Sequence, residues 1–392
     1  MRDFQTEKDL FSYVRSVVDH NTPSLKDIFA KYDWERLDIN TLIQLRNNPG
    51  ILLIDTRSEK EFEESHIPGA LSFPVLNTYE RHNVGLIYKK YSQRAAVWLA
   101  IKYADPKIPE LQRFLLENNA EDKPIVIYCW RGGGRSSYLA KMLSDLGCSP
   151  SKLTGGFKAY RKLVFDFFSR PIPFRLIEIS GITGTGKTLL LNAVKKDFPV
   201  IDLELSARHY SSLFGRVPYD IMHFEPVASQ SAFENNIFGD VINGIDKLPH
   251  FHPHYLIESE SRKVGNFQIP GTLFAGMQDC PTIRIHAPLE ERIKRIVKDY
   301  FGRDLKGIPP MMEILTKNRD FFKQQLSKDI YLLLIDHLQK GQVEDFTRIM
   351  MEKYYDKKYK EKPKKPIAVI DSSSIRDARL HLLDVLKSNG YL

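Results

Sequence analysis

This 392-residue sequence has little cysteine and no apolar run long enough to cross a membrane. The three cysteines, Cys129, Cys148 and Cys280, are too few and too scattered for a disulfide framework or a zinc cluster. Residues 1–20 lack the long apolar core and the small-residue cleavage site of a secretory signal. These absences predict a cytoplasmic location with reduced thiols, no metal site and no membrane partner.

Internal repeats and low-complexity segments are also absent, and the composition, 42% hydrophobic and 27% charged, is typical of an ordinary globular protein. Because 392 residues exceed a typical single domain, we expect two compact units. The formal net charge of +8 is compatible with a polyanionic partner. Charge alone does not identify that partner.

Short apolar runs alternate with helical stretches in both halves of the chain. ILLIDTRS and PIVIYC predict buried strands ending at Asp55 and Cys129, and SSYLAKMLSDLG predicts a helix. After the prolines of RPIPF, the segments FRLIEIS, PVIDLE and HYLIESE predict further strands. Strands separated by helices indicate an α/β fold with parallel sheets. We therefore predict a helical extension over residues 1–38 and α/β domains over 39–168 and 172–392, the last with a helical, basic C-terminal region.

The stretch VIYCWRGGGRSSYLA places Cys129 at the end of a predicted strand and just before a helix. Ligands of parallel α/β sheets bind at this edge. Three glycines follow, Gly132, Gly133 and Gly134. They let successive N–H groups point inward, and with the helix N-terminus they would cradle an anion. Arg131 and Arg135 would stabilise a thiolate or hold a phosphate-like oxyanion. The alternative is a structural cysteine followed by a flexible turn.

Three segments in this order resemble the rhodanese-type sulfurtransferases, whose loop cysteine carries a persulfide. They are LLIDTRSEKEFEESHIPGALSFP, the cysteine loop and LTGGFKAYRK. In the first segment Asp55 and Arg57 end a strand, while Glu61 and Phe62 lie in a helix. The resemblance implies a rhodanese-like parallel-sheet domain over residues 39–168.

The segment GITGTGKT satisfies the pattern G-x-x-x-x-G-K-[ST] between a predicted strand and a predicted helix, as the motif requires. Backbone N–H groups would hold a phosphate chain, Lys187 would neutralise its terminal phosphate, and Thr188 could ligate Mg²⁺. The predicted diphosphate-binding residues are Gly181, Gly184, Thr185, Gly186, Lys187 and Thr188. The pattern predicts an α/β domain of the P-loop NTPase type, without saying which phosphate compound binds.

Hydrolysis of a nucleoside triphosphate also needs a carboxylate at the end of a neighbouring strand. Two pairs are candidates, Glu258 with Glu260 and Asp202 with Glu204. Either pair could instead be strand-end charges that face solvent. No adenine-specific motif is present.

A rhodanese-like domain followed by a phosphate loop resembles the tRNA 2-selenouridine synthase family. The loop CWRGGGRS matches the family pattern CWRGG-x-RS, in which Trp130 replaces the residues usual in ordinary rhodaneses. Further resembling segments are PVLNTYERHNVGLIYK, DLELSARHYSSLFG, SQSAFEN, LIESESRKVGNFQIP, PLEERIKRIVKDY and MMEKYYDKKY. The helical extension has no counterpart in that pattern, and DLELSARH lacks the glycine expected after DLE.

The resemblance implies a transferase that converts 5-substituted 2-thiouridine at the wobble position of tRNA into 2-selenouridine. It implies S-geranylation by geranyl diphosphate, bound either at the P-loop itself or in an adjacent apolar groove, followed by selenium transfer from selenophosphate with loss of the geranyl thiol. Neither co-substrate is a tightly bound cofactor, and a selenophosphate-producing enzyme would be a partner. Lys187 would stabilise the departing diphosphate. The residues implied for selenophosphate are Cys129, Trp130, Arg131, Gly132, Gly133, Gly134, Arg135 and Ser136.

Residues 351–366 carry seven lysines against three acids, with tyrosines interleaved. Such a segment is typical of a surface that binds phosphates and stacks bases. The alternative is a solvated surface run whose tyrosines pack between helices. The candidate tRNA contacts are Arg208, His209, Arg216, Arg262, Lys263, Lys357, Lys358 and Tyr359.

Two other functions compete with selenouridine synthesis. One is a rhodanese-type sulfurtransferase with an ATP-dependent regulatory P-loop domain. The other is a nonenzymatic module that binds nucleic acid or phosphate, in which the rhodanese-like half only scaffolds. The intact Cys129 loop with both arginines argues against the second alternative, and the missing adenine motif argues against the first.

Overall fold

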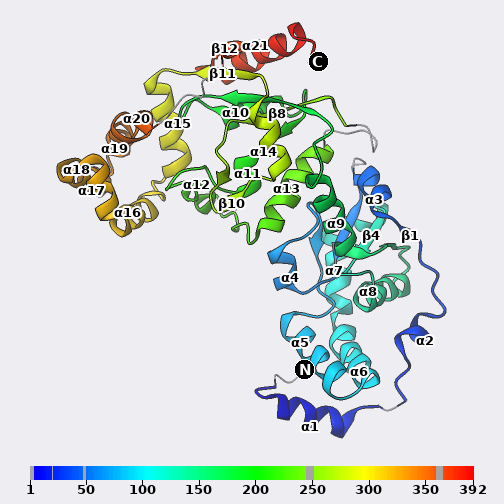
Figure 1. Ribbon diagram of the computed structural model, residues 1–392. Coiled ribbons are helices and arrows are strands. Elements are labelled where there is room, and N and C mark those ends of the chain that lie inside the picture. Colours follow the sequence, from blue (N-terminus) through cyan, green and yellow to red (C-terminus); the bar gives the residue numbers. More distant parts are fainter. Residues whose placement is uncertain (1–3, 20, 47–49, 244–250, 359–364) are drawn as a thin grey trace. The chain divides into compact units, whose positions relative to one another are not determined.

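The computed structural model describes residues 4–19, 21–46, 50–243, 251–358 and 365–392. The chain divides into two compact units, Met1–Asp166 and Phe167–Leu392 (Figure 1). Within the described ranges, no helix has both the length and the apolar character that a membrane span requires.

A parallel sheet with the strand order β1–β5–β4–β2–β3 forms the centre of the first unit. Its strands are Arg36–Leu37 (β1), Leu52–Asp55 (β2), Leu71–Ser72 (β3), Ile125–Tyr128 (β4) and Ser151–Leu153 (β5). Every residue of β2 and β4 is buried, which indicates that helices cover both faces of the sheet. The helices are α3 (Ile39–Arg46), α4 (Glu59–Glu64), α5 (Thr78–Lys90), α6 (Gln93–Ala104), α7 (Ile108–Glu117), α8 (Gly134–Asp145) and α9 (Gly156–Phe168).

The N-terminal segment is part of the core of this unit. Helix α1 (Glu7–Val17) buries Leu10 and Val14 in the same cluster as Trp98. Helix α2 (Leu25–Phe29) follows, and β1 then pairs with β5 at the sheet edge. The predicted extension therefore contains an edge strand as well as helices.

The second unit has its own parallel sheet, in the order β12–β11–β6–β8–β7. Its strands are Arg175–Ser180 (β6), Val200–Ile201 (β7), His254–Glu258 (β8), Thr282–His286 (β11) and Ala368–Asp371 (β12). A separate short hairpin joins Lys263–Val264 (β9) and Phe267–Gln268 (β10). The predicted strand PVIDLE is shorter than expected, because Asp202 caps α11 (Leu203–Ala207) by accepting a hydrogen bond from the Leu205 N–H. Together the two parallel sheets confirm the predicted α/β class.

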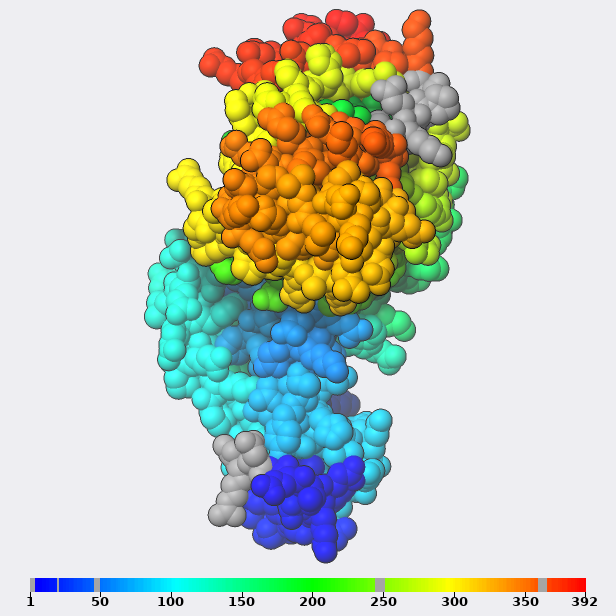
Figure 2. Space-filling model, turned by 90° about the vertical axis from the view of Figure 1, so that its left-hand side faces the viewer, coloured from blue at the N-terminus to red at the C-terminus, as the bar shows by residue number. Residues whose placement is uncertain are grey.

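Helices surround the second sheet and extend beyond it. Those near the sheet are α10 (Lys187–Val194), α12 (Val217–Ile221), α13 (Gln230–Asn243), α14 (Gly271–Gln278), α15 (Leu289–Phe301) and α21 (Ile375–Ser388). A further cluster with its own apolar core comprises α16 (Ile308–Lys317), α17 (Arg319–Leu326), α18 (Lys328–Gln339), α19 (Val343–Met350), a π-helical turn (Met351–Tyr355) and α20 (Asp356–Lys358). Figure 2 shows the outer surface of this cluster, in gold and orange. Helices α17 and α18 are separated at Ser327, whose φ is 96°.

Candidate functional site

Cys129 follows β4 directly and lies at the base of the loop that leads into α8. Its Sγ accepts hydrogen bonds from the Gly133 N–H at 3.2 Å and from the Ser136 hydroxyl at 3.3 Å. The cysteine is only 4% exposed. Two donors aimed at a buried sulfur would stabilise a negative charge on it. The structure thus brings together the cysteine, the glycines and the serine that the sequence singled out.

The Gly-Gly turn after β5 supports the cysteine loop from behind. The Phe157 N–H donates to the Cys129 carbonyl at 2.9 Å, and the Lys158 N–H donates to the Trp130 carbonyl at 3.0 Å. Gly156 has a φ of +58°, and a Cβ at this position would lie 2.2 Å from the Cys129 carbonyl oxygen. Only glycine fits here, because the two backbones approach too closely for any side chain.

The two arginines of the loop differ in their surroundings. Arg135 donates to both carboxylate oxygens of Glu61, at 2.5 Å and 3.2 Å, while Arg81 Nε lies 3.1 Å from one of them. Burial alone would raise the pKa of Glu61, but the bonds from Arg135 and the charge of Arg81 outweigh it and lower that pKa to about 2. Arg131 is exposed, and Trp130 is 41% exposed and packs on Phe157 with 5.7 Å between ring centroids. Arg131 is therefore accessible to an anion, whereas Arg135 is held beside the loop by a carboxylate.

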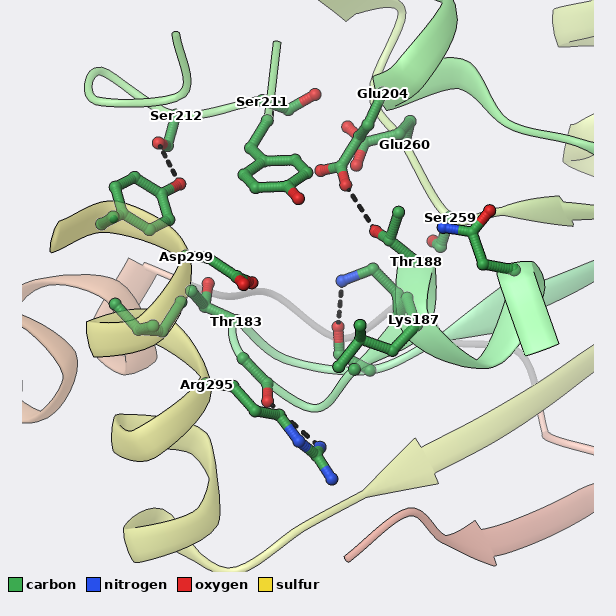
Figure 3. A pocket seen from close by; sticks show the side chains of 18 of the residues that line it. Thr183, Lys187, Thr188, Glu204, Ser211, Ser212, Ser259, Glu260, Arg295 and Asp299 are labelled. Carbon is green, nitrogen blue, oxygen red and sulfur yellow. Dashed lines mark hydrogen bonds between the residues drawn. The ribbon is translucent and has the colours of Figure 1, made fainter. Parts of the chain in front are cut away.

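The phosphate loop between β6 and α10 opens into a pocket of about 460 Å³ (Figure 3). Lys187 Nζ donates to the Gly181 carbonyl at 3.0 Å, and the Thr188 hydroxyl donates to Glu204 Oε2 at 2.8 Å. Gly184 and Gly186 have positive φ angles of 79° and 90°. The predicted loop residues line the pocket, apart from Thr185, whose side chain is buried behind it. This geometry suits a chain of phosphates facing Lys187.

Helix α15 packs against the phosphate loop and binds it with two arginines. Arg292 Nε donates to the Thr183 carbonyl at 2.8 Å, and its guanidinium pairs with Asp356. Arg295 donates to the Thr185 carbonyl at 2.7 Å and to the Ser373 carbonyl at 3.1 Å. The loop conformation is therefore fixed from outside by a helix more than a hundred residues away in sequence.

The carboxylates near the phosphate loop are buried, so the solvent-facing alternative is wrong for Asp202, Glu204 and Glu258. The Glu204 N–H donates to Glu258 Oε1 at 2.6 Å, while Glu258 Oε2 is buried and has no hydrogen-bond partner in the described part of the chain. Burial, together with the neighbouring carboxylates, raises the pKa of both glutamates. Across the described residues, no three His, Cys, Asp or Glu side chains are grouped to hold a metal ion.

The pocket wall opposite Lys187 carries one further carboxylate, Asp299 of α15 (Figure 3). Burial raises the pKa of Asp299 to about 6, although Lys298 and Arg295 lower it. Asp299 and Arg295 were not singled out from the sequence. The only signal for them was the segment PLEERIKRIVKDY, in which they stand four residues apart on one helical face.

The candidate tRNA contacts lie in several settings. Arg262, Lys263, Lys357 and Lys358 are exposed, and Lys358 Nζ lies 4.2 Å from the centre of the Tyr354 ring. Arg208 and Arg216 are half-buried. Arg208 donates to the Glu225 carbonyl, and Arg216 donates to the Phe224 carbonyl. His209 Nδ1 is buried and accepts or donates no hydrogen bond among the described residues, and burial lowers the pKa of the His209 ring. Tyr354 packs in the core of the helical cluster, and Tyr359 lies outside the described residues.

Comparison with known families finds one family match in each of the two compact units. Residues 38–163 match the rhodanese-like domain family, and residues 174–331 match the AAA domain of tRNA 2-selenouridine synthase. The tRNA 2-selenouridine synthase of Bdellovibrio bacteriovorus is 35% identical over 279 residues, which cover 69% of this chain and 72% of that protein. The chain belongs to the tRNA 2-selenouridine synthase family. Another member of this family, from Nitrosomonas europaea, is 31% identical over 70% of this chain and 71% of its own length.

Proposed function

We propose that this chain replaces sulfur by selenium at a 5-substituted 2-thiouridine in the wobble position of tRNA. The observation that supports this proposal is the chemistry of two loops in a chain that belongs to this family. Cys129 has two donors on its sulfur, and Lys187 faces a pocket large enough for a small diphosphate.

The first proposed step is S-geranylation at the phosphate loop. The sulfur of thiouridine attacks the allylic carbon of geranyl diphosphate, the carbon–oxygen bond breaks, and its electron pair leaves with the diphosphate. Lys187 and the N–H groups of the loop would stabilise the charge that develops on the departing oxygen. Alkylation turns sulfur into a thiolate leaving group, which prepares the ring for the second step.

The second proposed step is selenium transfer at the cysteine loop, with selenophosphate as the donor. The exposed guanidinium of Arg131, beside the glycine loop, suits the phosphate oxygens of that donor. Selenium bonds to C2 of the ring as the C2–S bond breaks and geranyl thiol leaves, and water then cleaves the selenium–phosphorus bond to release phosphate. Cys129 is required for this step. A selenophosphate-producing enzyme would supply the donor.

Mg²⁺ fits the phosphate loop only as a partner of the bound diphosphate. Thr188 and Glu204 supply two oxygens that are already 2.8 Å apart. Mg²⁺ commonly takes one or two protein ligands and completes its shell with phosphates and water. When bound, the ion would neutralise diphosphate charge, and Lys187 would share that task.

The tRNA is proposed to bind through its phosphates to exposed basic residues. Arg262, Lys263, Lys357 and Lys358 are the candidates with accessible side chains. Binding through them would weaken steeply as the salt concentration rises.

Two variants test the division of labour. Lys187→Ala should abolish geranylation of thiouridine tRNA while selenation of pre-geranylated tRNA continues. Cys129→Ala should stop at the geranylated nucleoside, and Cys148→Ala, at a half-buried cysteine elsewhere in the same unit, serves as the matched control. Equal loss of both steps in Lys187→Ala, or full selenation by Cys129→Ala, would refute the assignment. If the tRNA stays unchanged while the protein transfers sulfur from thiosulfate and turns over ATP, the alternative is favoured, a sulfurtransferase with an ATP-dependent regulatory P-loop domain.

A further inference from the structure

The geranylation step of the proposed function releases a proton, and the inference below rests on that step. The 2-thiouracil ring carries a hydrogen on N3 beside the C2=S group. When the sulfur forms its new bond to carbon, the ring becomes a neutral S-alkyl product only after N3 loses this proton. A base held at the reaction site would speed the step by accepting the proton as the bond forms.

Three carboxylates line the phosphate pocket: Glu204, Glu260 and Asp299. Glu204 already accepts a hydrogen bond from the Thr188 hydroxyl at 2.8 Å and is thereby tied to the phosphate loop. Glu260 lies on the same side of the pocket as Glu204. Both glutamates therefore belong to the side of the pocket where the diphosphate and its counter-charges are expected to lie.

Asp299 stands apart from this group. It forms no hydrogen bond and no ion pair with any residue in the described part of the chain, and it lines the wall contributed by α15. Arg295, one helical turn earlier, binds the Thr185 carbonyl of the phosphate loop at 2.7 Å. The same helix therefore fixes the loop and places a carboxylate with unused acceptor capacity in the pocket (Figure 3).

We propose that the Asp299 carboxylate is the general base that accepts the N3 proton of 2-thiouridine during S-geranylation. Sulfur–carbon bond formation, carbon–oxygen bond cleavage and proton transfer to Asp299 leave neutral S-geranyl nucleoside, diphosphate and a protonated carboxyl group. No oxidant or reductant is needed. Asp299 would then release the proton to solvent through the open pocket.

The surroundings of Asp299 suit this role. Burial raises the pKa of Asp299 to about 6, while Lys298 and Arg295 on its own helix lower it. Tyr210 and Tyr300 line the same pocket, and from the opposite elements so do Lys187, Glu204 and Glu260. At neutral pH the group is ionised yet more basic than an ordinary aspartate, which is the condition for an efficient base near pH 7.

The experiment measures initial rates of geranylation of thiouridine tRNA by the full chain from about pH 5 to about pH 9. Wild type should lose rate as the pH falls through about 6, where Asp299 becomes protonated. Asp299→Asn should be slower by about 100-fold at pH 7 and should recover as the pH rises and N3 ionises by itself. Its KM for geranyl diphosphate should stay within about twofold of wild type. Asp299→Glu should restore part of the rate.

Two controls separate this inference from the proposed function. Asp384→Asn, at an exposed position on α21, should leave the geranylation rate and its pH profile unchanged. Asp299→Asn and Asp384→Asn should also convert pre-geranylated tRNA to selenouridine tRNA at equal rates. If wild type geranylates and Asp299→Asn keeps its rate and pH profile, Asp299 is not the base. A raised KM with an unchanged pH profile would also overturn the proposal, because it would make Asp299 a binding group. Absence of geranylation by wild type would instead refute the proposed function itself.

Discussion

Replacing Gly156 by alanine should damage the cysteine loop without touching the phosphate site. Gly156 has a φ of +58°, and an added Cβ would lie 2.2 Å from the Cys129 carbonyl oxygen and 2.7 Å from the Gly132 nitrogen. Both contacts are backbone atoms, which cannot rotate away as a side chain can. The loop that holds the Cys129 sulfur must therefore move.

The loss in the free energy of unfolding caused by Gly156→Ala has two parts. A non-glycine residue in the left-handed region costs about 1–2 kcal/mol. Overpacking against fixed atoms adds about 1–3 kcal/mol. Gly147 provides the matched control, because its φ is +87° and its added Cβ would meet nothing within 4 Å. The free energy of unfolding should fall by only the first part in Gly147→Ala and by about 2–5 kcal/mol in total in Gly156→Ala.

Tryptophan fluorescence during urea unfolding measures this difference selectively. All three tryptophans, Trp34, Trp98 and Trp130, lie in the first unit. Their signal therefore reports the unfolding of that unit, although a chain with two units need not unfold in one step. Selenation of pre-geranylated tRNA gives the functional measurement, and it should fall in Gly156→Ala but not in Gly147→Ala.

Equal stability and equal selenation rates in the two variants would refute this account of the loop. That result would mean that the Gly-Gly turn does not determine the position of Cys129. Loss of geranylation in Gly156→Ala would contradict it as well, because the phosphate loop lies in the other unit.

Three further predictions concern contacts away from these glycines. Leu10→Ala should lower the free energy of unfolding of the first unit by about 2–5 kcal/mol, measured by tryptophan fluorescence, because Leu10 is 1% exposed in its core. A surface-like loss below about 0.5 kcal/mol would show that the extension does not stabilise the unit. Because the pKa of Glu61 is lowered from 4.5 to about 2, its ionised pairing stabilises the fold at neutral pH and is lost as the pH falls through that window. Glu61→Gln should therefore remove on the order of 2 kcal/mol of acid-sensitive stability, and an unchanged pH dependence of unfolding would contradict this. Arg295→Lys should raise the KM for geranyl diphosphate about tenfold, because it weakens the hydrogen bonds that hold the phosphate loop. An unchanged KM would show that these hydrogen bonds do not determine the binding of geranyl diphosphate.

The sequence predicted the elements that carry local patterns. Cys129 and Lys187 each follow a strand and precede a helix, and glycine spacing marks both turns, so local composition sufficed for both loops. The α/β class followed from the same alternation of strands and helices. These features depend on neighbours in sequence, which a single sequence displays.

The remaining features depend on contacts between distant residues. Arg135 meets Glu61 across 74 positions, and Arg295 meets Thr185 across 110. No local pattern shows that Arg135 pairs with a carboxylate, or that Asp299 has no hydrogen-bond partner among the residues the structure describes. The edge strand β1 was missed because two residues are too short for a periodic pattern, and pairing with β5 defines it.

Mass spectrometry of nucleosides from thiouridine tRNA tests the central claim most directly. The purified chain is incubated with geranyl diphosphate and selenophosphate, each alone and then together. The account predicts an S-geranyl nucleoside with geranyl diphosphate alone and 2-selenouridine only when both are present. Unchanged thiouridine under all conditions, or 2-selenouridine formed without geranyl diphosphate, would contradict it.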